Sequence, residues 1–209
     1  MHPTVVGIDV GGERNGFHAV ALQAGQFVDK AHCLEPDAVV DWCVERKAAT
    51  VAVDAPCRWS NSESSRLVER ELMRRGVHCF FTPARNHARA NKSGFYDWVF
   101  NGERLYESLE SRQYLRFDGE QTGGRICIET FPHAVVCAIA GRVISAKPKG
   151  KVRREVLKKI GYDVGMLSNI DFVDAALCAV AAAEFSKGSY QHFGNREEGF
   201  IIVPGRCQC

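Results

Sequence analysis

The sequence predicts an α/β protein, built on a mixed β-sheet with helices on both faces. Two observations carry this prediction. Short apolar runs suited to strands alternate with longer segments whose apolar residues recur at helical spacing. Residues 4–54 also follow the order strand, strand, strand, helix, strand, and a helical crossover of this kind returns the last strand parallel to the first.

The opening strands are expected to form an antiparallel meander followed by a central strand. The three meander strands cover residues 4–10, 16–22 and 26–34. Ala24-Gly25 favours a tight hairpin between the second and the third. A helix then begins at Pro36-Asp37, and the fourth strand, 50–54, is apolar on both faces, which is typical of a strand covered on both sides.

The remainder of the chain predicts five further helices, two of them inside an insertion, and a fifth sheet strand. The expected helices cover residues 63–75, 103–115, 132–140, 151–160 and 171–186. The fifth strand covers 125–130, and 200–204 is a further strand-like run. We expect one domain, 1–209, with an insertion of about 58–125 after the fourth strand.

Composition is that of an ordinary globular protein, with 45% apolar residues, 25% charged residues and a formal net charge of +2. No apolar run approaches the ~20 residues that a membrane span requires. No basic segment followed by an apolar one opens the chain, so a cytoplasmic location is expected. The nine cysteines include no Cys-x-x-Cys pair, which argues against a zinc ribbon or a thioredoxin motif.

Acidic residues end several of the apolar runs. Asp9, Asp54 and Glu129 each end an expected strand, and Asp171 and Asp174 lie on one face of the last helix. Strands one and four should be neighbours, so Asp9 and Asp54 are expected side by side. Such a cluster repels itself unless a divalent cation neutralises it. We therefore expect a Mg²⁺ or Mn²⁺ site here.

Each acid also has a structural interpretation. Asp9 and Asp54 could stabilise turns through the backbone. Asp171 follows Ser168 at the spacing of a capping box. Asp174 lies deeper in the helix on the side expected to face the sheet, where an acid is costly without a partner. Glu129 could be a ligand or a neighbouring base.

Basic residues gather in one short stretch that leads into the helix expected at 151–160. The candidate substrate-binding residues are Lys147, Lys149, Lys151, Arg153 and Arg154. A basic cluster beside an acidic one suits a polyanionic substrate whose phosphates need both cationic side chains and metal. A solvated helix face is the alternative.

Short motifs along nearly the whole chain resemble one family. They are Gly7-Ile8-Asp9, Ala52-Val53-Asp54-Ala55-Pro56, Arg70-Glu71-Leu72, Phe81-Thr82-Pro83, Glu129-Thr130-Phe131-Pro132, Asp171-Phe172-Val173-Asp174-Ala175 and the closing Glu198-Gly199-Phe200-Ile201-Ile202-Val203-Pro204. They resemble the domain of unknown function 429 family of predicted nucleases. The resemblance implies a ribonuclease H-like fold with a five-stranded mixed sheet and a RuvC-type arrangement of acids.

The resemblance implies two-metal hydrolysis of phosphodiester bonds in a nucleic acid, DNA or RNA. Asp9, Asp54 and Asp174 would hold Mg²⁺ or Mn²⁺, with Glu129 or Asp171 completing the site. The basic stretch would hold substrate phosphates away from the chemistry. The aromatic residues of the insertion are candidates to stack on bases, although core packing is their commoner role.

Three other functions fit parts of the sequence. Residues 7–12, Gly-Ile-Asp-Val-Gly-Gly, also resemble the phosphate-binding hairpin of actin-like ATPases and sugar kinases. A non-catalytic nucleic-acid-binding protein of the same fold is the second, and a hydrolase of small phosphorylated molecules is the third. The sequence leaves the oligomeric state open.

Overall fold

A mixed eight-stranded sheet forms the centre of the computed structural model, which describes residues 3–62, 64–120 and 123–205. Its strands are β1 (Thr4–Val10), β2 (Phe17–Gln23), β3 (Gln26–Cys33), β4 (Ala48–Asp54), β5 (Tyr114–Arg116), β6 (Arg125–Glu129), β7 (Tyr190–Asn195) and β8 (Gly199–Pro204). They lie in the order β3-β2-β1-β4-β6-β8-β7, and β5 pairs with β6. The predicted α/β class is confirmed.

The predicted arrangement of the first four strands is also confirmed, and the fifth expected strand, β6, lies next to β4. β1, β2 and β3 are antiparallel neighbours, β4 returns parallel to β1, and β6 is parallel to β4. Both Ala24 and Gly25 have positive φ angles, as a tight hairpin between twisted strands requires. The sheet has eight strands, whereas five were expected. The sequence contains no clear strand signal for β5, which is only three residues long, or for β7, which is a polar run without clear alternation.

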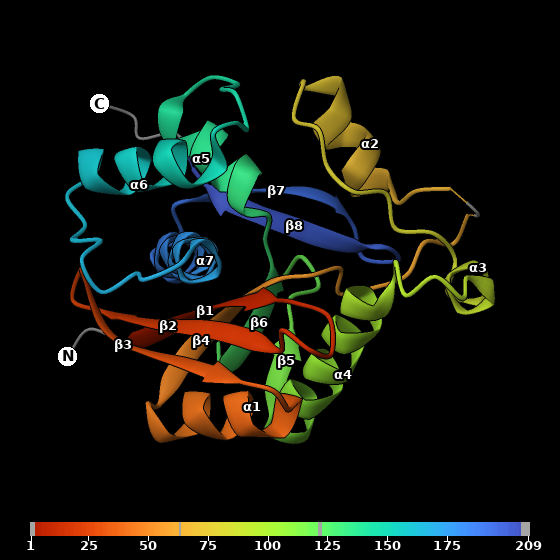
Figure 1. Ribbon diagram of the computed structural model, residues 1–209, viewed down its shortest axis with the longest axis horizontal. Coiled ribbons are helices and arrows are strands. Elements are labelled where there is room, and N and C mark those ends of the chain that lie inside the picture. The colour runs from red at the N-terminus through yellow and green to blue at the C-terminus, as the bar shows by residue number, and fades with distance from the viewer. Residues whose placement is uncertain (1–2, 63, 121–122, 206–209) are drawn as a thin grey trace.

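Seven helices cover the sheet within the described part of the chain. They are α1 (Pro36–Glu45), α2 (Leu67–Arg74), α3 (Arg85–Ala90), α4 (Asp97–Ser111), α5 (Pro132–Ala140), α6 (Lys149–Lys159) and α7 (Ile170–Ser186). The short α3 was not expected. The expected start of α2 at Glu63 lies outside the described residues, and the helix begins at Leu67. Figure 1 shows α7 on one face of the sheet, beneath α5 and α6, and α1 with α4 on the other.

Close contact between α7 and β1 depends on small residues. A Cβ atom at Gly7 would lie well inside 3.0 Å of the Ala175 carbonyl oxygen and the Ala179 backbone nitrogen. Real Cβ atoms essentially never come so near to backbone, so only glycine fits at this position. Five of the six alanines of α7 are fully buried and let its backbone pack closely on the strand. This contact brings the first turns of α7 over the ends of β1 and β4.

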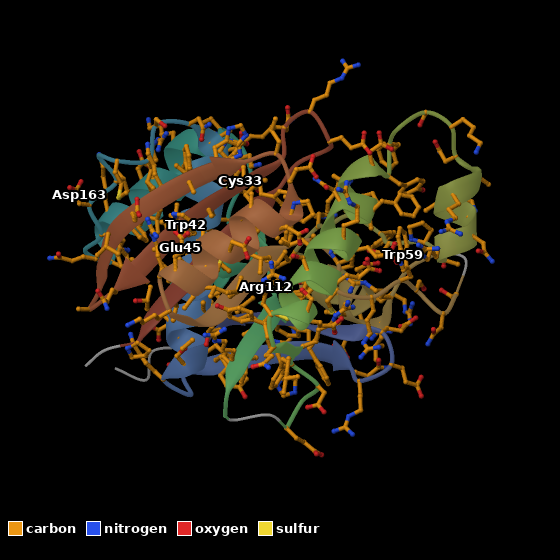
Figure 2. The ribbon with its side chains drawn as sticks, turned by 90° about the horizontal axis from the view of Figure 1, so that it is seen from below. Cys33, Trp42, Glu45, Trp59, Arg112 and Asp163 are labelled. Carbon is orange, nitrogen blue, oxygen red and sulfur yellow. The ribbon has the colours of Figure 1, made fainter. Side chains whose placement is uncertain are left out.

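The opposite face of the sheet carries a separate apolar core. Figure 2 shows α1 and α4 lying across this face, with Trp42 and Glu45 on α1 and Arg112 at the end of α4. An ion pair between Arg112 and Asp41, with 2.9 Å between nitrogen and oxygen, joins the two helices. Among the described residues, no helix has both the length and the apolar character needed to cross a bilayer.

Candidate active site

Asp9 and Asp54 end neighbouring parallel strands. They are direct partners in the pairing of β1 with β4, as are Gly7 and Ala52 two residues earlier. Side chains alternate between the faces of a sheet, so both carboxylates project on the same face as the missing Cβ of Gly7. That face is the one covered by α7. The predicted adjacency of the two aspartates is therefore present in the structure.

α7 contributes two more acids to the same place. Asp174 is fully buried in the second turn of the helix, and Asp171 is half-buried in the first. Asn169 caps the helix, because its side-chain oxygen accepts the backbone N–H of Phe172 at 2.9 Å. The capping box expected from Ser168 and Asp171 is thus replaced by a cap one residue further on, and helix capping no longer explains Asp171.

Burial and the neighbouring acids perturb the two strand-end aspartates, Asp9 and Asp54. Burial, followed by the charges of Asp54, Asp174 and Asp171, raises the pKa of Asp9 well above its usual range. Burial and the charge of Asp174 raise the pKa of Asp54 to about 7. Carboxyl groups with pKa values moved this far by burial and like charges are common at functional sites and costly elsewhere.

Two cations of α6 approach the same acids. Arg153 is buried and ion-paired with Asp174 Oδ1, and the Lys149 ammonium lies 2.7 Å from Asp174 Oδ2. The lysine contact has the distance of an ion pair without hydrogen-bond geometry, so Oδ2 is buried with no hydrogen-bond donor in the described structure. Lys149 and Arg153 therefore lie beside the acids, whereas the sequence led us to expect the basic stretch away from them.

The rest of the basic stretch faces outward. Lys147 and Lys151 are exposed, and Arg154 is half-buried, with one guanidinium nitrogen 3.3 Å from the Asn169 carbonyl oxygen. Lys147 lies just before α6, and Lys151 and Arg154 lie in its first turns, close in sequence to the two cations that reach Asp174.

The carboxylate oxygens at the strand ends are ligands of the type that a hard divalent cation prefers. Aspartate oxygens are the ligands that Mg²⁺ and Mn²⁺ prefer, and two adjacent buried carboxylates need a positive charge between them. Asp9 and Asp54 fit that requirement, and Asp174 Oδ2 is a buried oxygen without a donor. Within the described residues, no group of three or more His, Cys, Asp or Glu side chains is already arranged around one point. The pairing of Asp174 with Arg153 and Lys149 provides a physical reason.

Glu129 lies apart from these acids. In the pairing of β4 with β6 it is opposite Val53, one residue before Asp54, so its side chain starts from the other face of the sheet. Its carboxylate receives two hydrogen bonds from Arg66, at 2.5 and 2.8 Å, and one from the Cys57 backbone N–H at 2.8 Å. Arg66 and Glu129 are both almost fully buried.

Arg66 is held from two sides. Its Nε donates to Glu69 at 2.8 Å while its terminal nitrogens donate to Glu129. Burial opposes the arginine charge, but these two carboxylates outweigh it and hold the pKa of Arg66 well above its usual value. This buried network fixes the start of α2 against the end of β6, and it leaves Glu129 with a structural role in the geometry observed.

One residue near the aspartates escaped the sequence reasoning. His18 is the cross-strand partner of Asp9, so it shares the face covered by α7. Its ring stacks on His32 with centroids 4.3 Å apart, and its Nε2 lies 3.3 Å from the Asn169 amide nitrogen. Burial and the neighbouring His32 lower the pKa of His18, so its environment favours the neutral imidazole. The connection between β1 and β2 sets that register, whereas the Ala24-Gly25 hairpin sets only the pairing of His18 with His32 in β3.

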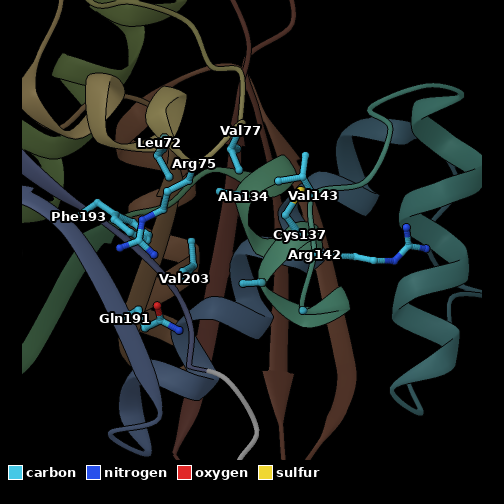
Figure 3. Close-up of a pocket in the computed structure, with 12 residues that line it drawn as sticks. Leu72, Arg75, Val77, Ala134, Cys137, Arg142, Val143, Gln191, Phe193 and Val203 are labelled. Atoms are coloured by element: carbon cyan, nitrogen blue, oxygen red, sulfur yellow. The ribbon is translucent and has the colours of Figure 1, made fainter.

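A separate pocket lies away from the aspartates, between α2, α5 and the β7–β8 hairpin. Figure 3 shows its walls, which are apolar except for Gln191 and two arginines. Arg75 stacks on Phe193, with 4.6 Å from the guanidinium carbon to the ring centroid. None of the four aspartates lines this pocket. It has no part in the chemistry considered below.

Comparison with known families gives one match. The family model described as Protein of unknown function (DUF429) matches residues 7–199. The chain belongs to this family. The family resemblance carried by the short motifs is thereby confirmed. Curated proteins give no match in sequence.

Among solved structures, the chain is similar to the RuvC structure of Thermus thermophilus. The two share 14% sequence identity over 88% of this chain and 95% of that one, with a TM-score of 0.42. A likeness of this strength carries no function across. The functional proposals for this chain therefore rest on its own residues.

Proposed function

We propose that this protein is a divalent-metal-dependent nuclease that hydrolyses phosphodiester bonds of nucleic acid. One observation carries the proposal: Asp9, Asp54 and Asp174, from three elements distant in sequence, lie within electrostatic range of one another on the α7 face. Asp174 is paired with Arg153 and Lys149, but Asp9 and Asp54 make no ion pair among the described residues, and their mutual repulsion destabilises the folded chain.

Asp9 and Asp54 are the residues we assign to holding Mg²⁺ or Mn²⁺, with Asp174 or Asp171 completing the coordination. A bound divalent cation would lower the pKa of an attacking water and stabilise the leaving oxygen. Arg153 orients Asp174 through the buried ion pair. Lys149 is half-exposed at its side chain, so its ammonium can turn from Asp174 toward a substrate phosphate.

The substrate class follows from the charges around the acids. Lys147, Lys149, Lys151 and Arg154 lie at one end of α6, next to the acids, and such a basic stretch beside a metal site suits a polyanion whose further phosphates contact cations. A nucleic acid meets that description, and the proposal leaves DNA and RNA open. Because phosphate contacts release counterions, binding should weaken steeply with salt. A small phosphorylated substrate would show only weak salt dependence.

Cleavage of labelled single-stranded and duplex DNA and RNA in Mn²⁺ tests the proposal. The wild type should cleave at least one of the four and stop on chelation. Asp9→Asn and Asp54→Asn should each lower the rate by 10²-fold or more, a typical effect of losing a group that stabilises the transition state. Asp163→Asn is the matched control, because Asp163 is exposed and contacts only the nearby Gly165 backbone N–H. Equal cleavage by all variants, or none by the wild type, contradicts the proposal.

A non-catalytic nucleic-acid-binding role is the second candidate. The ion pairs of Asp174 with Arg153 and Lys149 favour it, because cations of the chain itself already neutralise the third acid. In that case nucleic acid would bind with unchanged affinity after chelation and would never be cut. Binding that strengthens with Mn²⁺ and is followed by cleavage supports the nuclease.

A further inference from the structure

The apolar cavity between α2, α5 and the β7–β8 hairpin is separate from the aspartates, and Figure 3 shows the residues around it. Its volume is about 150 Å³. Protein interiors leave few voids larger than a water molecule, because unfilled space forfeits van der Waals contacts. The uncharged side chains that line it are buried: Leu72, Val77, Ala134, Cys137, Phe193 and Val203. A cavity of this size and lining is a candidate to hold a ligand.

The volume of the cavity limits what it can hold. An apolar cavity of about 150 Å³ takes up a molecule the size of benzene. Gly141 and Val143, which follow α5, line the cavity and are exposed, so they mark its mouth. A single six-membered ring or a short branched chain fills such a space, whereas a nucleotide is too large for it.

A positive charge lies at the wall of this apolar space. The guanidinium carbon of Arg75 is 4.6 Å from the centroid of the Phe193 ring, and this cation–π contact holds the cation beside the cavity. Arg75 is exposed and has no ion-pair partner within the described part of the chain. Arg142, the other arginine of the lining, points away from the cavity in Figure 3. One oriented cation therefore serves the cavity.

The polar groups at the cavity favour a carboxylate over other anions. The planar guanidinium of arginine matches the two oxygens of a carboxylate, which it binds through paired hydrogen bonds. A single cation balances a single negative charge, whereas a phosphate monoester carries more. Gln191 on β7 lines the same space and is half-buried, and its amide supplies further N–H donors.

We propose that this cavity binds a small monocarboxylate, with its ring or branched chain against Leu72, Val77 and Phe193 and its carboxylate paired with Arg75. The inference goes beyond the proposed function and does not depend on it, because no aspartate lines the cavity. The ligand would contact α2, α5 and the β7–β8 hairpin together. Its binding should therefore stabilise the folded chain.

Three probes separate the contribution of the ring from that of the charge. They are benzoate, its uncharged isostere benzamide, and acetate, which has the charge without the ring. In a calorimetric titration in chelator, benzoate should bind roughly 10- to 100-fold more tightly than benzamide, the range that corresponds to hydrogen bonds to a charged group. Acetate should bind more weakly than benzoate, because it buries almost no apolar surface. Benzoate at about ten times its dissociation constant should raise Tm by roughly 3–6 °C.

Substitutions locate the binding in this cavity. Arg75→Gln should lower the affinity for benzoate to that for benzamide and leave the affinity for benzamide unchanged. Arg142→Gln is the matched control, because it removes an equal charge from a side chain that points away from the cavity. Ala138 is half-buried in the cavity wall on α5, so Ala138→Leu should fill the space and weaken both aromatic probes roughly tenfold or more.

Three results would overturn the inference. The first is the absence of saturable benzoate binding at millimolar concentration. The second is an equal effect of Arg75→Gln and Arg142→Gln, which would show that Arg75 does not pair with the carboxylate. The third is full benzoate affinity in Ala138→Leu, which would place the ligand elsewhere. Each leaves the nuclease proposal standing, and a failure of cleavage in Mn²⁺ would equally leave this cavity as a carboxylate site.

Discussion

At the scale of single residues, the paired carboxylates of Asp9 and Asp54 make the folded chain less stable than it would be without them. Their pKa values are raised because burial and mutual repulsion disfavour the ionised forms. A raised folded pKa means that the folded state holds a proton which the unfolded state has already lost. Stability at Asp54 therefore falls as the pH rises from the ordinary aspartate pKa toward about 7.

Replacing Asp54 by asparagine should remove that repulsion. We expect Asp54→Asn to be more stable than the wild type by about 1 kcal/mol or more at pH 8 without divalent ions. The gain should shrink at pH 5, where the folded wild type keeps its proton. Urea unfolding at both pH values measures it. A loss of stability, or an equal gain at both pH values, would show that the carboxyl group is not under electrostatic strain.

Glu129 has a different residue-scale test, because its carboxylate bonds to Arg66 and not to the other acids. Glu129→Gln should cost about 2–4 kcal/mol, since it leaves the buried guanidinium with one charged partner, Glu69. The affinity for Mn²⁺ should stay within about twofold. Urea unfolding and a Mn²⁺ titration give the two numbers. Lost metal affinity at unchanged stability would instead make Glu129 a ligand, as the sequence allowed.

At the scale of elements, the close packing of α7 on β1 determines whether Asp174 lies near Asp9 and Asp54. Gly7→Ala would force the two backbones apart, and we expect a loss of about 3 kcal/mol or more, or failure to fold. Gly12→Ala is the matched control: nothing lies within 4 Å of its added Cβ, so its stability should change by no more than about 1 kcal/mol. Thermal unfolding compares them. A stable Gly7→Ala variant would mean that the fold does not require close packing of α7 on β1.

The docking of α6 on α7 has its own consequence. Lys149 places a positive charge beside Asp174, where it competes with a metal ion for the same oxygen. Lys149→Ala should therefore raise the affinity for Mn²⁺ by roughly 3- to 10-fold, a modest effect because the side chain is half-exposed and screened. Lys151→Ala, on the same helix and exposed, should change it little. Titration by isothermal calorimetry decides, and equal affinities for both variants would exclude competition at Asp174.

At the scale of the whole molecule, the sheet begins with strands from the N-terminal part of the chain. Elements near the C-terminus complete the fold: α7 covers one face of the sheet, and the β7–β8 hairpin adds two strands. Strand order was accessible from the sequence, because hydrophobic runs, the Ala24-Gly25 turn and one crossover helix constrain it strongly. That order alone brought Asp9 beside Asp54. The alanines of α7 likewise indicated that this helix lies close to the sheet. The position of Asp174 near the strand ends followed from that packing.

Other features of the site depend on registers and contacts that no local pattern specifies. A shift of one residue along β6 decides that Glu129 starts from the opposite face to Asp54. The pairing of Lys149 and Arg153 with Asp174 depends on how α6 docks on α7, and Lys149 lay before the helix expected at 151–160. Arg66 was visible only as one basic residue among many, because its partners come from separate elements.

The central claim is that Asp9 and Asp54 together hold a divalent cation, and locating that cation tests it most directly. Crystals soaked in Mn²⁺ and measured at the manganese absorption edge would reveal the ion by its anomalous scattering. We predict an ion at about 2.0–2.2 Å from a carboxylate oxygen of each aspartate, with Asp174 or Asp171 as a further ligand. An ion bound elsewhere, or no ion between Asp9 and Asp54 at millimolar Mn²⁺, would contradict the account.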